Sequence, residues 1–196
     1  IPQRPRVNLE TMLTLSLHPV ENRSPHHDVE FQYRRLAPDR LSLSFLLRGG
    51  EKVALGKINP QPARRDELWK QTCFECFMVN AADRSLNARY VEWNLAPSGD
   101  WQGYGFTGYR EGRSEVSLEV PRLTRKQDGE IFIFEFQLPI PSELRNTGFE
   151  IGVSAVVQEL ADESPFYWAF AHRAEKPDFH NREAMLVIVP DAKDGE

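Results

Sequence analysis

Short runs in which apolar and polar residues alternate recur along most of the chain, and this period of two is typical of strands with one buried face. Pro and Gly residues separate the runs, and only residues 141–146 and 159–163 resemble helical turns. The pattern therefore predicts an all-β fold, a single-domain antiparallel β-sandwich of the jelly-roll or immunoglobulin-like kind with about ten or eleven strands. The predicted strands include residues 11–17, 40–47, 114–120, 131–138 and 149–158.

Residues 90–109 show the most informative alternation and are expected to form a β-hairpin, with the turn sequence Ala96-Pro-Ser-Gly-Asp100 at its centre. A four-residue loop would place Trp93 opposite Tyr104 and gather the bulky apolar side chains on one face. A five-residue loop would instead place Trp93 opposite Gly103. A one-residue slip moves every side chain to the other face, so burial favours the four-residue loop.

This register gives the predicted hairpin two unlike faces, one apolar and one polar. Glycines inside a strand often mark the close approach of a ligand, although a bulge or a bend explains them equally well. The polar face is therefore the first candidate for a binding surface. The apolar face holds Val91, Trp93, Leu95, Tyr104 and Phe106, and the polar face holds Tyr90, Glu92 and Asn94 beside Gly103 and Gly105, bordered by Trp101 and Tyr109.

The composition, with 40% hydrophobic and 27% charged residues over 196 positions, is that of a globular domain. Basic residues are scattered among acidic ones at a net charge of -5, so nucleic acid is not an expected partner. No apolar run is long enough to span a bilayer, and the first residues lack the apolar core of a secretory signal. We expect one domain over residues 1–196 with flexible ends at 1–10 and 190–196, located in the cytoplasm, or in the periplasm if a signal peptide has been removed.

The two cysteines, Cys73 and Cys76, have the spacing of a redox or metal motif. Their surroundings are those of an apolar strand, however, where residues three apart point to opposite faces. There is also no second cysteine pair to complete a structural zinc site. We therefore expect two buried free thiols and no metal site.

Aromatic residues at strand ends and on the polar face are candidates for stacking on a sugar or another planar ligand. Such rings also build the cores of β-sandwiches, so each has a structural alternative. The candidates are Trp69, Tyr90, Trp101, Tyr109 and Trp168.

Two acidic residues stand out because they lie in strands. Glu75 lies between apolar neighbours and Glu92 lies on the polar hairpin face. Carboxyl groups on neighbouring strands could bind hydroxyl groups, or act as acid and base as they do in glycosidases. A solvated face or an ion pair with a local arginine is the structural alternative.

His172 and His180 bracket a loop in which Asp178 could orient His180 by a hydrogen bond. With Met78 or Met185, a histidine could also form an axial pair for haem iron, or it could simply be hydrogen-bonded within the loop. The sequence contains no G-x-S-x-G, no Gly-rich phosphate loop and no H-E-x-x-H, so no motif requires an enzyme.

Several motifs in order resemble the bacterial DOMON-like domains of the DOMON and family 9 carbohydrate-binding-module superfamily. They are LWKQTCFECF at 68–77, YVEWNLAPSGDW at 90–101, Tyr104 with Phe106, Tyr109-Arg110, YWAFAH at 167–172 and KPDFH at 176–180. The resemblance implies a β-sandwich with a ligand pocket on one sheet. It also suggests Trp69 and Trp168 as counterparts of the tryptophan pair that holds the sugar in family 9 modules.

The resemblance and the polar hairpin face together lead us to expect a non-catalytic module that binds a carbohydrate or another small molecule, without a cofactor. A haem-binding domain in electron transfer and a hydrolase acting on a glycoside are the alternatives. The expected ligand-binding residues are Trp69, Glu75, Tyr90, Glu92, Asn94, Trp101, Tyr109, Arg110, Trp168, His172, Asp178 and His180.

Overall fold

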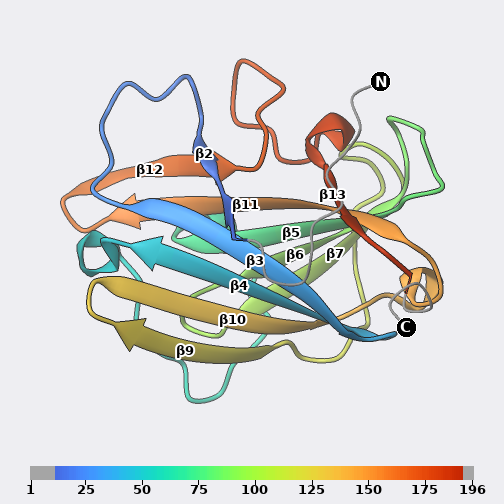
Figure 1. Cartoon of the computed structure of the whole chain (residues 1–196), viewed down its shortest axis with the longest axis horizontal. Coiled ribbons are helices and arrows are strands. Elements are labelled where there is room, and N and C mark those ends of the chain that lie inside the picture. The colour runs from blue at the N-terminus through green and yellow to red at the C-terminus, as the bar shows by residue number, and fades with distance from the viewer. Residues whose placement is uncertain (1–11, 192–196) are drawn as a thin grey trace.

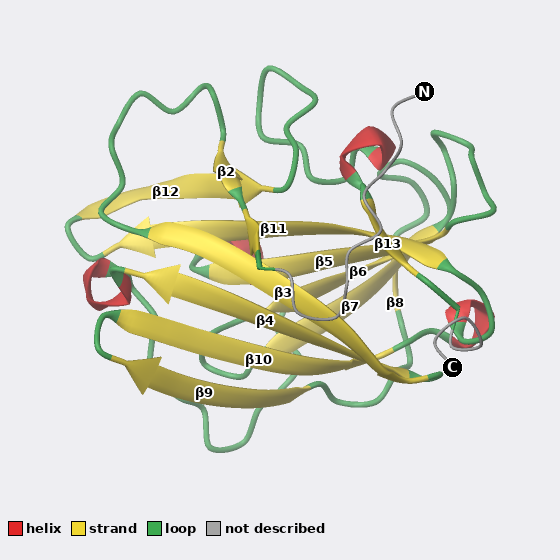
Figure 2. Cartoon of the chain, viewed as in Figure 1, coloured by secondary structure: helices red, strands yellow, loops and turns green. Residues whose placement is uncertain are grey.

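The computed structural model describes residues 12–191 and shows two antiparallel β-sheets that face each other (Figure 1). Helical structure in this part of the chain is limited to four 3-10 turns of three residues each, drawn in red in Figure 2. The predicted all-β sandwich is therefore confirmed. The turns are η1 (Gly50–Lys52), η2 (Leu68–Lys70), η3 (Ser142–Leu144) and η4 (Arg182–Ala184).

The smaller sheet has five strands and the larger sheet has eight. The five-stranded sheet has the order β1 (Leu13–Thr14), β3 (Asp28–Ala37), β4 (Arg40–Arg48), β10 (Ile131–Pro139) and β9 (Arg122–Asp128). The eight-stranded sheet has the order β2 (Ser16–Leu17), β12 (Asp162–Ala169), β11 (Phe149–Glu159), β5 (Cys73–Asn80), β6 (Tyr90–Leu95), β7 (Trp101–Phe106) and β8 (Ser114–Glu115), and β13 (Val187–Val189) pairs with β11.

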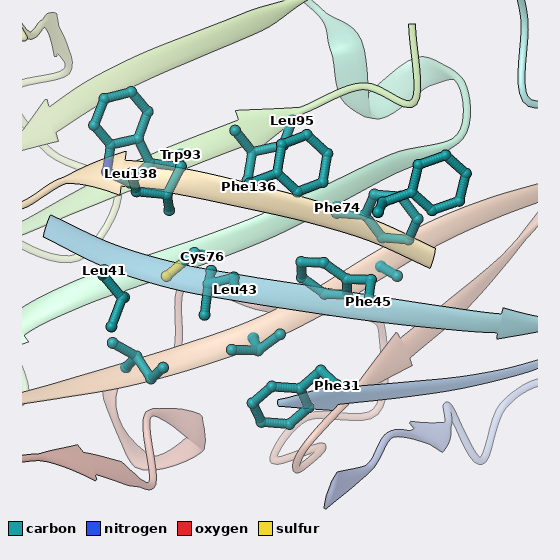
Figure 3. Packing of buried hydrophobic residues seen from close by; sticks show 14 of the residues in the cluster. Phe31, Leu41, Leu43, Phe45, Phe74, Cys76, Trp93, Leu95, Phe136 and Leu138 are labelled. Carbon is teal, nitrogen blue, oxygen red and sulfur yellow. The ribbon is translucent and has the colours of Figure 1, made fainter. Parts of the chain in front are cut away.

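The main core fills the space between the sheets. Alternate residues of each strand point inward, so β4 contributes Leu41, Leu43 and Phe45, while β5 and β6 contribute Phe74 and Trp93 (Figure 3). Phe45 stacks on Phe74 across the two sheets, with 4.5 Å between ring centroids. These contacts remove apolar surface from water and fix which face of each strand is inside.

A second apolar cluster covers the outer face of the eight-stranded sheet. It includes Phe77, Tyr104, Phe106 and Met185, with Trp69 of η2 packed against it. Phe179, from the long connection between β12 and β13, also packs here; this connection is the orange-to-red part of the chain in Figure 1. Both faces of the eight-stranded sheet are therefore partly apolar, whereas the hairpin pattern predicted only one apolar face.

The predicted register of the central hairpin is wrong by one residue. The loop has five residues, and Trp93 lies opposite Gly103 while Glu92 lies opposite Tyr104. The glycines thus face the core, where a Cβ at Gly103 would lie 2.7 Å from Val116 Cγ2 and 3.3 Å from Trp93 Cζ3. The bulk of the Trp93 indole requires a bare neighbour, and Tyr104 is buried on the outer face instead.

Other differences concern the edges of the sheets. β9 was not predicted, because its sequence RLTRKQD is mostly charged and polar. The strand expected over residues 114–120 is limited to β8, and the helical turn expected over residues 159–163 is the connection of β11 to β12. Several of the thirteen described strands have only two or three residues, which accounts for the smaller predicted number.

Cys73 and Cys76 are both buried and free, as predicted. Within residues 12–191 no helix has the length and apolar character needed to cross a membrane. The flexible ends predicted for residues 1–10 and 190–196 lie, except for residues 190 and 191, outside the described residues.

Candidate functional site

The outer face of the eight-stranded sheet carries a pocket of about 480 Å³. This volume is within the range of about 300–1,000 Å³ found for small-molecule sites. Side chains of strands β5, β6, β7, β11 and β12 form its floor and part of its sides, and η2, the turn after β7 and the connection after β12 complete its walls. The pocket is lined by Trp69, Glu75, Glu92, Tyr104, Phe106, Arg110, Arg113, Val156, Tyr167, Pro177, Phe179 and His180.

Strand register brings the two glutamates of the floor together. Glu75 of β5 lies opposite Asn94 of β6, and Glu92 is two residues before Asn94 on the same face. The glutamates are therefore diagonal neighbours, within reach of each other across the strand pair. Both are almost fully buried, with exposed fractions of 4% and 5%.

Each glutamate has one carboxyl oxygen held by the protein. Ser154 donates a hydrogen bond of 2.8 Å to Glu75 Oε2, and the Asn94 amide donates one of 2.6 Å to Glu92 Oε1. Asn94 is held in turn by the Cys73 thiol, whose sulfur lies 3.7 Å from Asn94 Oδ1. Among the described residues, no hydrogen bond is recorded for Glu75 Oε1 or Glu92 Oε2, so both oxygens are available to a ligand.

Burial changes the ionisation of both glutamates. It raises the pKa of Glu75 to about 8, and the neighbouring charge of Glu92 adds to the effect, while the hydrogen bond from Ser154 opposes it. Burial also raises the pKa of Glu92, against the Asn94 hydrogen bond and the positive charges of Arg110 and Arg113. Glu92 has the stronger positive surroundings, so it ionises first and Glu75 holds the proton near neutral pH.

His180 lies close to Glu92 and is half-buried among the rings of Phe77, Tyr90 and Phe106. Its Nδ1 is 2.8 Å from the Tyr90 hydroxyl oxygen, and its Nε2 is 3.9 Å from Glu92 Oε2. Burial, with the charge of Arg110, lowers the pKa of His180 to about 4, against the opposite effect of Asp178. The imidazole is therefore neutral at physiological pH.

Asp178 joins the two loops that border the pocket. Its carboxylate accepts hydrogen bonds from the Tyr109 hydroxyl, at 2.7 Å, and from the Arg110 guanidinium, at 3.0 Å. Arg110 adopts a left-handed backbone conformation with a φ of 57°, which non-glycine residues rarely adopt. The Arg110 side chain reaches Asp178 and also lines the pocket, where its positive charge acts on both glutamates.

Aromatic rings form the walls of the pocket. Trp69 meets Tyr104 edge to face, with centroids 6.3 Å apart, and Tyr167 lies 6.2 Å from Phe179 on the other side. The Arg113 guanidinium lies over the Tyr104 ring, 5.0 Å from its centroid. The walls therefore offer flat apolar surfaces above a floor of hydrogen-bonding groups.

The structure places the twelve predicted site residues in three groups. Five of them, Trp69, Glu75, Glu92, Arg110 and His180, line the pocket. Four others contact lining residues from behind or from the side, as described above: Tyr90, Asn94, Tyr109 and Asp178.

The remaining three lie elsewhere, which corrects their expected placement. Trp101 and Trp168 belong to the core between the sheets, because they alternate with Gln102 and Tyr167, which point outward. The Trp168 indole donates a hydrogen bond of 3.0 Å to His27. His172 is held against the Ser16 carbonyl, with Nε2 2.7 Å from that oxygen, and does not line the pocket.

Sequence reasoning missed several lining residues. It assigned Tyr104 and Phe106 to the core because of the incorrect register. It passed over Tyr167 in favour of its neighbour Trp168, although strand alternation allowed either residue to face outward. Arg113 and Pro177 lie in loops, where no periodic pattern indicates which side chains point inward.

The axial pairs considered for haem are not assembled. Met78 belongs to the core cluster on the opposite side of the sheet from His180. Met185 is buried in the outer cluster, close above Gly152, and does not line the pocket. No group of three or more His, Cys, Asp or Glu side chains among residues 12–191 is arranged to hold a metal ion.

No family model matches this chain, and a search of the curated proteins finds no significantly similar protein. The DOMON-like relationship therefore stays an expectation from the sequence motifs, and the function is inferred from the geometry of the pocket.

Proposed function

We propose that this chain is a non-catalytic binding module whose outer-face pocket takes a small hydroxylated ligand of the carbohydrate type. The observation that carries the proposal is the pair of free carboxyl oxygens, Glu75 Oε1 and Glu92 Oε2, on the floor of an aromatic-walled pocket. Buried carboxyl groups are costly unless a ligand or water completes their hydrogen bonds, and here the protonated Glu75 can donate while the ionised Glu92 accepts. Sugar hydroxyl groups both accept and donate, so they suit both residues.

The walls support the same class of ligand. A sugar ring presents C–H groups on its faces and hydroxyl groups at its edge. Trp69, Tyr104 and Tyr167 offer flat surfaces to the former, while the glutamates and His180 offer hydrogen bonds to the latter. Small-molecule sites commonly combine apolar contact with a few polar groups that fix orientation.

One observation favours a glycoside hydrolase as a second candidate. Two carboxyl groups lie in one pocket, and burial raises the pKa of Glu75 to about 8 while Glu92 ionises first. A protonated acid beside an ionised carboxylate is the arrangement that glycosidases use. Turnover of chromogenic glycosides that is lost in both Glu75→Gln and Glu92→Gln would favour this candidate over simple binding.

Calorimetric titration against a panel of mono- and disaccharides tests the proposed binding function. We expect at least one sugar to bind the wild type, and Glu92→Gln to weaken that binding at least tenfold, because the amide replaces a charged acceptor. The matched control is Glu135→Gln, since Glu135 lies on the five-stranded sheet and its carboxylate accepts a bond from Ser42. An affinity that is unchanged in Glu92→Gln, or no binding to any sugar, would contradict the proposal.

A further inference from the structure

We infer that Glu92 and His180 form a subsite for one uncharged hydroxyl group of the ligand, and that Tyr90 is the positioning residue that sets it by fixing the tautomer of His180. This inference rests on the proposed function and deepens it, because it selects neutral sugars over amino sugars and sugar acids. The subsite is defined by the direction of two hydrogen bonds, from Arg110 to Tyr90 and from Tyr90 to His180, and by the gap between His180 and Glu92.

The Tyr90 hydroxyl connects the backbone of the turn after β7 to His180. The Arg110 backbone N–H donates to the Tyr90 oxygen, at 3.2 Å. The only hydrogen of the Tyr90 hydroxyl is then free to point at His180 Nδ1, 2.8 Å away. Nδ1 accepts it, and in a neutral imidazole the proton must therefore be on Nε2. Tyr90 itself is held in place by Phe106, whose ring stacks on it at 4.7 Å.

This tautomer places a donor next to an acceptor. His180 Nε2–H and Glu92 Oε2 are 3.9 Å apart, which is too far for a direct hydrogen bond. An oxygen about 2.8 Å from each atom fits across this gap. A hydroxyl group is both a donor and an acceptor, so it can accept from His180 and donate to Glu92 at the same time.

Charged groups do not fit this pair equally well. An ammonium group has no lone pair to accept from His180 Nε2–H, and the Arg110 and Arg113 guanidinium groups border the same pocket. A carboxylate has no hydrogen to donate to Glu92 and would be repelled by it. The subsite therefore discriminates by hydrogen-bond direction as well as by charge.

The tautomer can be measured without a ligand. Long-range ¹H–¹⁵N correlation spectra of the wild type should show His180 protonated at Nε2. In Tyr90→Phe the hydroxyl is gone and the spectrum should show a shift toward a mixture of tautomers. The matched control, Tyr33→Phe, removes a tyrosine hydroxyl that bonds the Ile188 carbonyl away from the pocket, and it should keep the wild-type tautomer. Nδ1 protonation in the wild type would overturn the inference, whatever the pocket binds.

Selectivity is tested by titrating the wild type with glucose, glucosamine and glucuronate, and with the same three forms in the galactose and mannose series. We expect the neutral sugar to bind at least tenfold more tightly than its charged forms, and Tyr90→Phe to weaken neutral-sugar binding about tenfold while Tyr33→Phe does not. Preferred binding of an amino sugar or a sugar acid would overturn the subsite and leave the binding function standing. Absence of binding in every series would contradict the proposed function itself.

Discussion

The burial of Glu75 and Glu92 lowers the stability of the folded state, because burial disfavours their charged forms. Strand alternation is the reason that they are buried: each shares its face with Phe77 and Tyr104, which loops and η2 then cover. A polar group that weakens the fold is expected where it serves a ligand. The protein lowers the cost by holding one oxygen of each carboxyl group with Ser154 or Asn94.

The raised pKa of Glu75 predicts a specific dependence of stability on pH. The unfolded carboxyl ionises near its usual pKa of 4.5 and the folded one near 8. The stability contributed by the neutral form is therefore present below about 4.5 and is lost as pH rises to about 8. Urea unfolding of wild type and Glu75→Gln should show a difference in free energy of unfolding that shifts in favour of the variant across this window.

The comparison of variant with wild type isolates Glu75 from other titrating groups. His180, whose folded pKa is lowered to about 4, contributes an opposite slope between about 4 and 6.5 in both proteins. A constant difference between wild type and Glu75→Gln from pH 4.5 to 8 would show that Glu75 ionises normally in the folded state.

At the level of single residues, alternation predicted from the sequence that Tyr90, Glu92 and Asn94 share one face, whereas only the family resemblance suggested Glu75 for the site. Alternation could not decide between Tyr167 and Trp168, because both are aromatic and either phase of the strand was plausible. The partners on β11 explain which ring faces the core: Trp168 lies opposite the small Ala155, and Tyr167 lies opposite Val156 on the other face. The larger ring therefore fills the core beside the smaller partner.

At the level of elements, β7 shows how one strand serves two apolar faces. Its alternate residues Tyr104 and Phe106 cover the outer face, while Gly103 and Gly105 leave space for Trp93 and Val116 on the inner face. A prediction that assumes one buried face per strand chooses the wrong register here. The same assumption works for β4, whose outward residues include Ser42 and Ser44.

The register of β7 predicts an asymmetry between its two glycines. Gly103→Ala places a methyl group 2.7 Å from Val116 and 3.3 Å from Trp93, whereas the nearest atom to a Cβ at Gly105 is 3.2 Å away. We expect Gly103→Ala to lower the free energy of unfolding by about 1–3 kcal/mol, as overpacking does, and Gly105→Ala to cost less. Chemical denaturation measures both.

A double-mutant cycle supplies the control for this asymmetry. Val116→Ala removes the closest atom, so the cost of Gly103→Ala should be smaller in the Val116→Ala background than in the wild type. Equal costs in both backgrounds, or no cost at all, would be inconsistent with a glycine that faces the core.

β9 was missed for a different physical reason. It is the edge strand of the five-stranded sheet, and its Arg, Lys and Asp side chains discourage pairing with another chain. β9 is stabilised by its pairing with β10 and has too few apolar residues to bury a face of its own. Apolar–polar alternation in the sequence therefore cannot predict it.

At the scale of the molecule, the two-layer architecture could be predicted because many short alternating strands leave few other solutions. The pocket could be predicted only in part. Its floor comes from strands and was indicated by their periodicity, but its walls combine residues 107–113 with residues 176–180 and η2. These segments meet through tertiary contacts such as those of Asp178 with Tyr109 and Arg110, which no local pattern encodes.

The most direct test of the central claim is to locate binding on the two sheets. Backbone ¹H–¹⁵N spectra recorded during titration with the tightest-binding sugar of the panel should show shifts at Glu75, Glu92 and Tyr167. The account predicts no comparable shifts at Ser44 or Thr124, on the outer face of the five-stranded sheet. Shifts confined to that sheet, or none with any sugar at millimolar concentration, would contradict a binding site on the outer face of the eight-stranded sheet.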